Sequence, residues 1–326
     1  MASDEQRDGV SLTNLDQTLF PGADATKRDL VDYLDAVAEV FIPQLRDRPL
    51  SVIRVLRGQA PFMQKNVPKY TPDFVQTVQL WAETSHRQVA YALCNDRRTL
   101  LWFANQRAIE YHPTLVRTDH WDSPDYLILD LDPSADLPPI DGFGQAVRAA
   151  ELVREALAQV GLAGAAKTSG SKGMHVFVPL AAGQTSSDAA AATRAIAARA
   201  ERLDPDFATT AFIKEDRGGK VFLDATRAGG ATVVATYSPR ARPCTPVSFP
   251  VEWADLSSVT PQDFSVRNAA DLLAGRDLWA ELMPAPQSLP ADLVAEGMAI
   301  PVARVQAMHE GKRRARARRD QGPAAG

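Results

Sequence analysis

The sequence predicts an α/β (α+β) protein built as two closely packed lobes. The chain has 326 residues, a length that suits one large domain or two intimate lobes, because single domains usually contain ~100–200 residues. Short apolar runs that end in aspartates, such as 126–133 (YLILDLDP) and 220–224 (KVFLD), are typical of buried strands. Longer segments with apolar residues at helical spacing lie between such runs. This alternation of strands and helices indicates sheets flanked by helices.

The first third of the chain is predicted to form a helix followed by a strand. Residues 1–10 are polar and are expected to be flexible. A helix is predicted to begin after Thr26, because Thr26 and Asp29 fit a capping box, and to end near Arg46. The run 50–56 (LSVIRVL) has strand character. The core face of the helix is predicted from four apolar residues at helical spacing: Leu30, Leu34, Val37 and Phe41.

The rest of the chain supplies a second set of strands and helices. A helix is predicted over 143–160, with Gly161 as its C-terminal stop. The segment 187–203 is predicted to be a helix so rich in alanine that a neighbour on its packing face must approach closely. The other predicted elements are strands after 126, 173, 220 and 231, a helix over 268–282, and an Ala/Pro-rich extension over 285–326.

Composition and charge restrict the function classes. Hydrophobic residues make up 45% and charged residues 23% of the chain, as in an ordinary globular protein. The net charge of −4 predicts no general attraction to nucleic acid, so such a function must rest on local clusters. Cys94 and Cys244 lie far apart in the sequence, which predicts reduced thiols in a cytoplasm. The polar N-terminus and the lack of a long apolar run predict neither an export signal nor a membrane span.

Two aspartates at the end of one predicted strand are the first candidate site. Asp130 and Asp132 are two residues apart, so on a strand their side chains face the same side. Carboxylates that close repel each other unless a cation lies between them. The pair therefore predicts a divalent metal site with oxygen ligands, of the kind that Mg²⁺ or Mn²⁺ uses. The alternative is a pair of solvated aspartates before a turn.

The segment 167–180 (KTSGSKGMHVFVPL) is a candidate phosphate-binding loop. Its small residues let backbone N–H groups approach a phosphate, and Ser169, Lys172 and His175 add hydrogen-bond donors and charge. It is not a Walker A loop, because that motif opens a helix and this loop opens a strand. The alternative is a polar hairpin with a solvated lysine.

A third aspartate and two arginines complete the candidate chemistry. Asp224 ends an apolar run, as Asp130 and Asp132 do. Arg240 and Arg242 are two residues apart on predicted extended chain, which suits a triphosphate clamp. Three aspartates and two donor-rich segments together predict two-metal phosphoryl chemistry.

Three further residues and the basic tail each allow more than one interpretation. Phe62 and Met63 lie in a Gly/Pro-rich segment and either fold back into the core or stack on a nucleic-acid base. His112 precedes a proline and is of interest only if it lies near the aspartates. The basic tail GKRRARARRD is either a solvated end or a non-specific phosphate binder.

The order of these motifs resembles the polymerase domain of bacterial DNA ligase D, which belongs to the archaeo-eukaryotic primase superfamily. The matching segments are DLDP, TSGSKGMH, KVFLD and YSPRAR, together with RPLSVIRV, PFMQK and AIEYHP. The resemblance implies a two-lobed primase-polymerase fold, with the active-site cleft between β-sheets flanked by helices, in a catalytic domain over 11–284. Because no ligase or nuclease segment is recognised, the chain resembles a stand-alone relative of the Prim-PolC kind.

The resemblance also implies a reaction and its site residues. The reaction is template-directed nucleotide addition to a primer 3′-hydroxyl, often with ribonucleotides and with two Mn²⁺ (or Mg²⁺) ions. By motif position, the implied metal ligands are Asp130, Asp132 and Asp224. The implied contacts of the incoming nucleotide are His112, Ser169, Lys172, His175, Lys220, Arg240 and Arg242. The implied DNA contacts are Lys27, Phe62, Met63 and Lys65.

Two departures from the family pattern concern the DNA substrate. Lys27 matches a lysine that grips a 5′-phosphate across a gap, but Gln17 stands where a second such lysine is common. Met63 stands where a second aromatic residue is common. These departures favour gap filling in excision repair over end joining at double-strand breaks. The expected partners are gapped or primer–template DNA, NTP or dNTP, and a DNA ligase or other repair protein, and the protein is expected to be a cytoplasmic, nucleoid-associated monomer.

Two other function classes stay open at this point. One is a non-catalytic DNA-binding module that has kept the fold, although aspartates at all three positions argue against it. The other is a phosphohydrolase, because DLDPS loosely fits the DxDx[TV] start of haloacid-dehalogenase phosphatases. Ser134 replaces the threonine or valine expected there.

Overall fold

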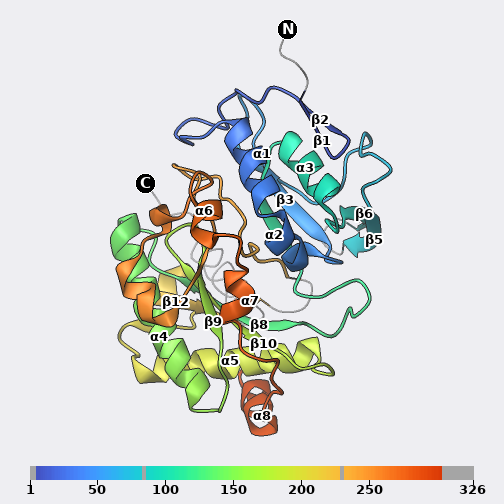
Figure 1. Cartoon of the computed structure of the whole chain (residues 1–326). Coiled ribbons are helices and arrows are strands. Elements are labelled where there is room, and N and C mark those ends of the chain that lie inside the picture. Colours follow the sequence, from blue (N-terminus) through green and yellow to red (C-terminus); the bar gives the residue numbers. More distant parts are fainter. Residues whose placement is uncertain (1–4, 83–85, 228–230, 303–326) are drawn as a thin grey trace, which may run out of the picture.

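The N-terminal lobe is a sheet packed against three helices. In the computed structural model, which describes residues 5–82, 86–227 and 231–302, this lobe lies above a second one (Figure 1). Strand β3 pairs with three neighbours, β4, β6 and β7, and β5 pairs with β6 at the edge. The strands are β3 (Leu50–Arg54), β4 (Phe62–Gln64), β5 (Thr77–Ala82), β6 (Arg87–Ala92) and β7 (Ala108–Pro113). The helices are α1 (Lys27–Ala36), α2 (Ala38–Leu45) and α3 (Arg97–Asn105).

The C-terminal lobe is a six-stranded sheet in the order β11-β12-β8-β10-β9-β13. Its strands are β8 (Tyr126–Asp132), β9 (Ala165–Thr168), β10 (Met174–Pro179), β11 (Ala208–Thr209), β12 (Val221–Asp224) and β13 (Pro250–Val251). Two long helices, α4 (Pro139–Ala158) and α5 (Ser186–Leu203), pack against each other and against this sheet. The α/β fold class predicted from the sequence is thus confirmed.

Three short α-helices follow in the described C-terminal part of the chain, namely α6 (Ala269–Leu273), α7 (Leu278–Leu282) and α8 (Ala291–Ala299). Helix α6 contacts α1 of the N-terminal lobe, and the other two contact the C-terminal lobe. Helix α8 lies against α5 (Figure 1). A Cβ added at Gly297 would lie 1.8 Å from the Ala191 carbonyl oxygen, so only glycine permits this contact. The close approach predicted for the alanine-rich helix is therefore confirmed.

Several element boundaries agree with the sequence. Thr26 caps α1, and the capping box with Asp29 is present. The buried strand predicted at the DLDP motif is β8, which ends at Asp132. The prediction of one helix up to Arg46 was wrong in detail, because the chain ends α1 at Ala36 and begins α2 at Ala38.

Two predicted elements differ more. The helix predicted over 268–282 is two short helices, because Ala274 and Gly275 both adopt positive φ angles (50° and 77°) between them. The strand predicted over 231–242 is irregular apart from two isolated bridges, one between Thr114 and Thr232 and one between Pro239 and Val247. At Tyr237 a φ of 70° turns the chain.

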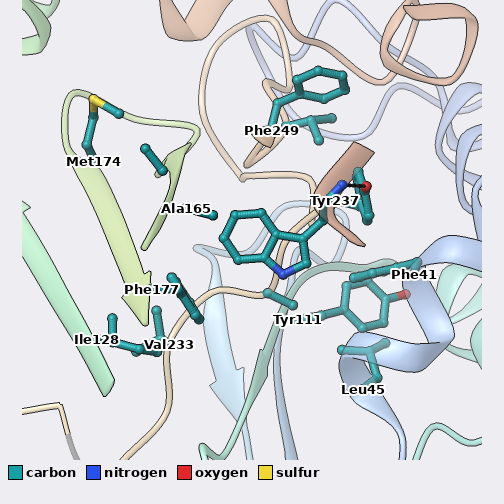
Figure 2. Close-up of a cluster of buried hydrophobic side chains, with 14 of the residues drawn as sticks. Phe41, Leu45, Tyr111, Ile128, Ala165, Met174, Phe177, Val233, Tyr237 and Phe249 are labelled. Carbon is teal, nitrogen blue, oxygen red and sulfur yellow. Dashed lines mark hydrogen bonds between the residues drawn. The ribbon is translucent and has the colours of Figure 1, made fainter. Parts of the chain in front are cut away.

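The irregular segment 231–248 joins the two lobes. Its backbone pairs with β7 of the N-terminal lobe through Ala235 N to Tyr111 O, at 2.9 Å. Tyr33 of α1 donates its hydroxyl to the Tyr237 carbonyl at 2.7 Å. Figure 2 shows Tyr237 within a cluster that contains Tyr111 from the upper sheet and Phe177 from the lower one. The lobes therefore share one hydrophobic core, which fixes the two sheets relative to each other.

The ends of the described chain are also ordered by side-chain contacts. Residues Glu5–Arg7 (β1) and Val10–Leu12 (β2) form a small hairpin, and Arg7 pairs with Asp32 and Asp35 of α1. Residues 5–10 thus differ from the expected flexible start, whereas residues 1–4 and the basic tail lie outside the described residues. Within the described ranges, the structure has no helix with the length and apolar character needed to cross a bilayer.

Candidate active site

Strand register places four polar residues in one row across the C-terminal sheet. Asp224 of β12 pairs with Asp130 of β8. Asp130 pairs in turn with His175 of β10, and His175 pairs with Lys167 of β9. Directly paired residues face the same side of a sheet, with Cβ atoms ~4.5–5.5 Å apart. The sheet therefore gathers these side chains on one face from segments almost 100 positions apart in the sequence.

The three predicted aspartates form a compact cluster. Carboxylate oxygens of Asp130, Asp132 and Asp224 all lie within 4.8 Å of one another. The Asp130 side chain is 13% exposed and that of Asp224 is 7% exposed, whereas Asp132 at the strand end is exposed. One oxygen of Asp224 accepts hydrogen bonds from the backbone N–H and hydroxyl of Thr226, at 2.8 and 2.6 Å. This leaves its other oxygen directed into the cluster.

The charges of the cluster influence one another. Loss of hydration and the negative charges of Asp130 and Asp224 raise the pKa of Asp132 above its usual range. Burial alone would also raise the pKa of Asp130, but the His175 ring and the Arg227 guanidinium keep it below its usual value. Three converging carboxylates suit a hard divalent cation such as Mg²⁺ or Mn²⁺, which takes oxygen ligands. The donor set thus fits the metal site predicted from the sequence.

Arg227 contacts the same carboxylates and was not predicted. Its Nη2 lies 3.4 Å from Asp130 Oδ2, and its Nε lies 3.3 Å from Asp224 Oδ2. A second arginine, Arg217, is near enough for its charge to act on Asp132 and Asp224. Its guanidinium lies 3.7 Å above the Phe222 ring and donates to two backbone carbonyls, those of Ala211 and Phe212.

His175 supports the acidic cluster. Its Nε2 lies 3.3 Å from Asp130 Oδ1, and its Nδ1 lies 2.9 Å from Lys167 Nζ. With Lys167 as an ammonium, which has three donors and no acceptor, Nδ1 accepts and the ring proton is on Nε2, facing Asp130. Burial, followed by the charge of Lys167, lowers the pKa of His175 to about 4, so the ring is neutral at pH 7. The structure therefore places His175 beside a predicted metal ligand.

Lys172 and Ser169 lie in the turn between β9 and β10. The Ser169 hydroxyl accepts hydrogen bonds from Ser171 N and Gly173 N, both at 3.2 Å. Lys172 Nζ donates to the Ser134 carbonyl, at 2.6 Å, in the loop after β8. A Cβ added at Gly170, whose φ is 66°, would lie 2.6 Å from Arg240 Cγ. The turn thus lies between the DLDP loop and Arg240.

Glu110, a residue that the sequence did not single out, connects two that were predicted. Its carboxylate lies 2.9 Å from His112 Nε2 and 3.1 Å from Arg240 Nε, and it accepts the Ala241 backbone N–H at 2.9 Å. Arg240 also donates to the Ser169 carbonyl. Burial would raise the pKa of Glu110, but the His112 hydrogen bond and the Arg240 charge lower it to about 2. His112 and Arg240 are therefore brought together, whereas Arg242 is exposed.

The predicted DNA contacts on β4 face opposite sides. Met63 pairs with Ile53, and Ile53 pairs with Glu110, so these three side chains share the sheet face that carries His112. Phe62 pairs with Arg54, and its ring lies 5.9 Å from the Arg54 guanidinium. Met63 is 46% exposed and Phe62 is 37% exposed.

The other predicted contact residues are more scattered. Lys27 is buried, and its Nζ donates to Thr13 O and Asn105 Oδ1, both at 2.6 Å. Burial, followed by the charge of Arg107, lowers the pKa of Lys27 to about 8. Lys65 is exposed. Lys220 donates to the Pro205 carbonyl at the end of β12 opposite Asp224, so the structure does not bring it to the acidic cluster.

Sequence signals existed for the three residues that were missed. Lys167 and His175 lie the same number of residues before and after Ser171, the centre of the turn. Residues spaced in this way pair across a hairpin. Glu110 precedes His112 by two residues on a strand, so both face the same side. Arg227 follows Asp224 by three residues, just after the turn that Thr226 caps. Pairing rules were thus sufficient for the first two, and only local turn geometry was available for the third.

Comparisons with known proteins find similar domains. A family model described as the LigD primase-polymerase domain matches residues 26–279. A bifunctional non-homologous end joining protein LigD of Bacillus subtilis is 33% identical over 267 residues, which cover 80% of this chain and 42% of that protein. A multifunctional non-homologous end joining protein LigD of Mycobacterium bovis is 33% identical over 268 residues, covering 78% of this chain and 34% of that protein.

A solved structure shows the same fold. The polymerase domain of Mycobacterium tuberculosis ligase D in complex with DNA matches with a TM-score of 0.75 and 30% identity. The match covers 85% of this chain and 98% of that chain. This chain thus spans nearly all of a single polymerase domain, but less than half of the length of the curated relatives.

Proposed function

This chain belongs to the LigD primase-polymerase domain family and is therefore a nucleotidyltransferase, and we propose that it fills short gaps in DNA during repair. The reaction is the attack of a primer 3′-hydroxyl on the α-phosphate of an incoming nucleotide, with loss of pyrophosphate. The observation that carries the proposal is the cluster of Asp130, Asp132 and Asp224 beside a turn rich in hydrogen-bond donors. The family resemblance further supports ribonucleotides as the favoured substrates.

The acidic cluster is the proposed metal site. Asp130, Asp132 and Asp224 would hold two divalent cations, which we propose to be Mn²⁺ or Mg²⁺. When bound, such cations supply charge neutralisation and activation of the attacking hydroxyl. Neutral His175 keeps a proton on the nitrogen that faces Asp130, so it orients that carboxylate without adding charge.

The basic groups near the turn are the proposed triphosphate site. Among the described residues, the Lys172 ammonium donates one hydrogen bond, to the Ser134 carbonyl, and it can exchange this acceptor for a phosphate oxygen. Arg242 is exposed and follows Arg240, which Glu110 and the Ser169 carbonyl hold in place. Phosphoryl transfer depends mainly on positioning and charge stabilisation. We therefore assign Lys172 and Arg242 to the phosphates and Arg240 to the shape of the turn.

The choice between two DNA substrates rests on Lys27. Both its hydrogen bonds go to protein oxygens, and Gln17, whose carbonyl accepts the Lys27 backbone N–H at 2.8 Å, adds no charge. This arrangement supports weak retention of a downstream 5′-phosphate and hence gap filling in excision repair. End joining at double-strand breaks is the second candidate, because the similar proteins of Bacillus subtilis and Mycobacterium bovis are named for it.

One assay tests the proposal and separates the two candidates. A primer is extended across gaps of one to several nucleotides, with Mn²⁺ and with ribo- or deoxyribonucleotides, in the presence or absence of a downstream 5′-phosphate. Gap filling predicts extension that depends little on the phosphate, and end joining predicts extension that requires it. The Asp130→Asn variant should be inactive, and extension by that variant at the wild-type rate would refute the proposed chemistry.

A further inference from the structure

Arg227 takes up the oxygens that a cation would need. Asp130 contacts His175 through Oδ1 and Asp224 contacts Thr226 through Oδ1, so the Oδ2 atoms are the oxygens of the two residues that these contacts leave open to the cluster. Both Oδ2 atoms contact the Arg227 guanidinium, at 3.4 and 3.3 Å. The guanidinium therefore lies where two carboxylates converge and neutralises them.

The contact is electrostatic and is not fixed by directional bonds. Arg227 Nε is buried, and it has no hydrogen-bond partner within the described part of the chain. The Arg227 side chain as a whole is 38% exposed, so it can leave toward solvent. Arg217 is a useful contrast, because two backbone carbonyls and the face of Phe222 hold its guanidinium in place. Of these two arginines near the aspartates, Arg227 is the one that can be displaced.

We propose that Arg227 is a resident counter-cation of the acidic cluster, which a divalent metal must displace in order to bind Asp130 and Asp224. The inference rests on the proposed function only in taking this cluster as the metal site. The guanidinium and a divalent cation are both positive and would approach the same two Oδ2 atoms, so each disfavours the presence of the other. Competition of this kind weakens metal binding by the free protein and stabilises the cluster when metal is scarce.

Metal binding by the full chain, without nucleotide or DNA, tests the inference. Mn²⁺ is titrated into wild-type protein, Arg227→Gln and Arg227→Lys, and free Mn²⁺ is followed by electron paramagnetic resonance. We expect Arg227→Gln to bind Mn²⁺ about tenfold more tightly than the wild type, within the usual range of couplings between ligands. Arg227→Lys should be intermediate, because it keeps the charge but cannot bridge two carboxylates. Equal or weaker Mn²⁺ binding by Arg227→Gln would overturn the inference.

Two further measurements separate displacement from a general effect of charge. Arg148→Gln removes an arginine–aspartate pair, with Asp204, away from the cluster, and it should leave Mn²⁺ affinity unchanged. In wild-type protein, Mg²⁺ should speed the exchange of the Arg227 Nε proton with water in NMR spectra, while the Arg217 Nε proton is unaffected. An Arg227 proton that does not respond to saturating Mg²⁺ would mean that the guanidinium stays in place.

The outcome is independent of polymerase activity. If Arg227→Gln unfolds without metal, it can be purified with Mn²⁺ and titrated with a chelator, and a dissociation constant equal to that of the wild type would again reject the inference. Because no nucleotide is present, an inactive enzyme with the expected metal affinities would reject only the proposed function. An active enzyme with unchanged affinities would reject only the role of Arg227.

Discussion

Lys167 Nζ lies 2.9 Å from Nδ1 of His175, and the Lys167 side chain is fully buried in the C-terminal lobe. The same ammonium donates to Ser248 Oγ at 2.6 Å and to the Val234 carbonyl at 3.0 Å. Burial, followed by the nearby charge of Arg240, lowers the pKa of Lys167 well below its usual value. A lysine in this setting acts through its hydrogen bonds, and the most informative of them fixes the orientation of His175 toward Asp130.

Replacing Lys167 with methionine should therefore impair the candidate site indirectly, because Lys167 acts on Asp130 through His175. Loss of the donor frees the His175 ring to rotate and to protonate at Nδ1, and supporting residues of this kind typically contribute about 10–100-fold to metal affinity or activity. We expect Lys167→Met to lower primer extension within that range and to give an Nδ1-protonated ring population in ¹⁵N NMR spectra. The variant should also be destabilised by about 2 kcal/mol, because Ser248 and the Val234 carbonyl lose a buried partner.

A matched variant controls for the loss of a lysine. Lys69→Met removes an exposed lysine from the N-terminal lobe and should change neither the His175 spectrum nor the stability. If Lys167→Met extended primers at the wild-type rate and kept the His175 tautomer, the Lys167 contact would not be needed to orient His175.

Glu110 predicts a change of stability with pH. Its pKa is about 2 in the folded protein against an ordinary 4.5, so the folded state favours the ionised form. This stabilisation is present in full above pH 4.5 and is lost as the pH falls toward 2. A pKa lowered from 4.5 to about 2 corresponds to a stabilisation of about 3 kcal/mol. We expect Glu110→Gln to be less stable than the wild type at pH 7 and the two to converge near pH 2.

Urea unfolding at pH 7, 5 and 3 measures this convergence. Glu110→Gln keeps the volume of the side chain and a hydrogen-bond acceptor for Ala241 N, but it removes the charge that faces Arg240. A constant difference in unfolding free energy across this pH range would contradict the assignment. The same variant should release Arg240 from its position and thereby also reduce primer extension.

Site residues could be predicted from the sequence where they belong to one local motif. They were harder to predict where their proximity depends on the pairing of strands far apart in the chain. Asp130 and Asp132 could be predicted as a pair because i and i+2 share a face of one strand. Asp224 could be assigned to the same site only from the order of the motifs. Its position opposite Asp130 results from the pairing of β12 with β8, which the local sequence does not give. The split of the helix predicted over 268–282 could not be foreseen, since Ala274 adopts a φ of 50° that alanine rarely does.

The predicted DNA contacts illustrate a second limit of the sequence. Phe62 and Met63 are neighbours in a strand, so they face opposite sides, but which one shares the face of Glu110 and His112 depends on the pairing of β3 with β4 and β7. Lys27 was expected at a phosphate, and its burial against Thr13 and Asn105 became visible only in the folded chain. Side-chain environment, rather than residue type, decides the charge state of that lysine.

The lowered pKa of Lys27 predicts a pH-dependent preference for 5′-phosphorylated DNA. A phosphate is attracted by the protonated lysine, which is lost as the pH rises through about 8. We expect the affinity ratio between gapped DNA with a 5′-phosphate and with a 5′-hydroxyl to fall between pH 7 and pH 9. Fluorescence anisotropy with the two duplexes measures the ratio. Lys27→Met should give a ratio near one at every pH, and a pH-dependent ratio in that variant would assign the effect to another group.

Met63 and Phe62 offer a matched pair of variants on one strand. Met63 faces the side of the sheet that carries Glu110 and His112, whereas Phe62 lies over Arg54. We expect a template base to lie on the side of Met63. Stacking on an aromatic side chain stabilises a base by ~1–3 kcal/mol. We expect Met63→Phe to tighten binding of primer–template DNA by about fivefold, which corresponds to the lower end of that range. Phe62→Ala should weaken binding less than Met63→Ala does, as measured by anisotropy at fixed salt, and the reverse order would place the DNA on the opposite face of β4.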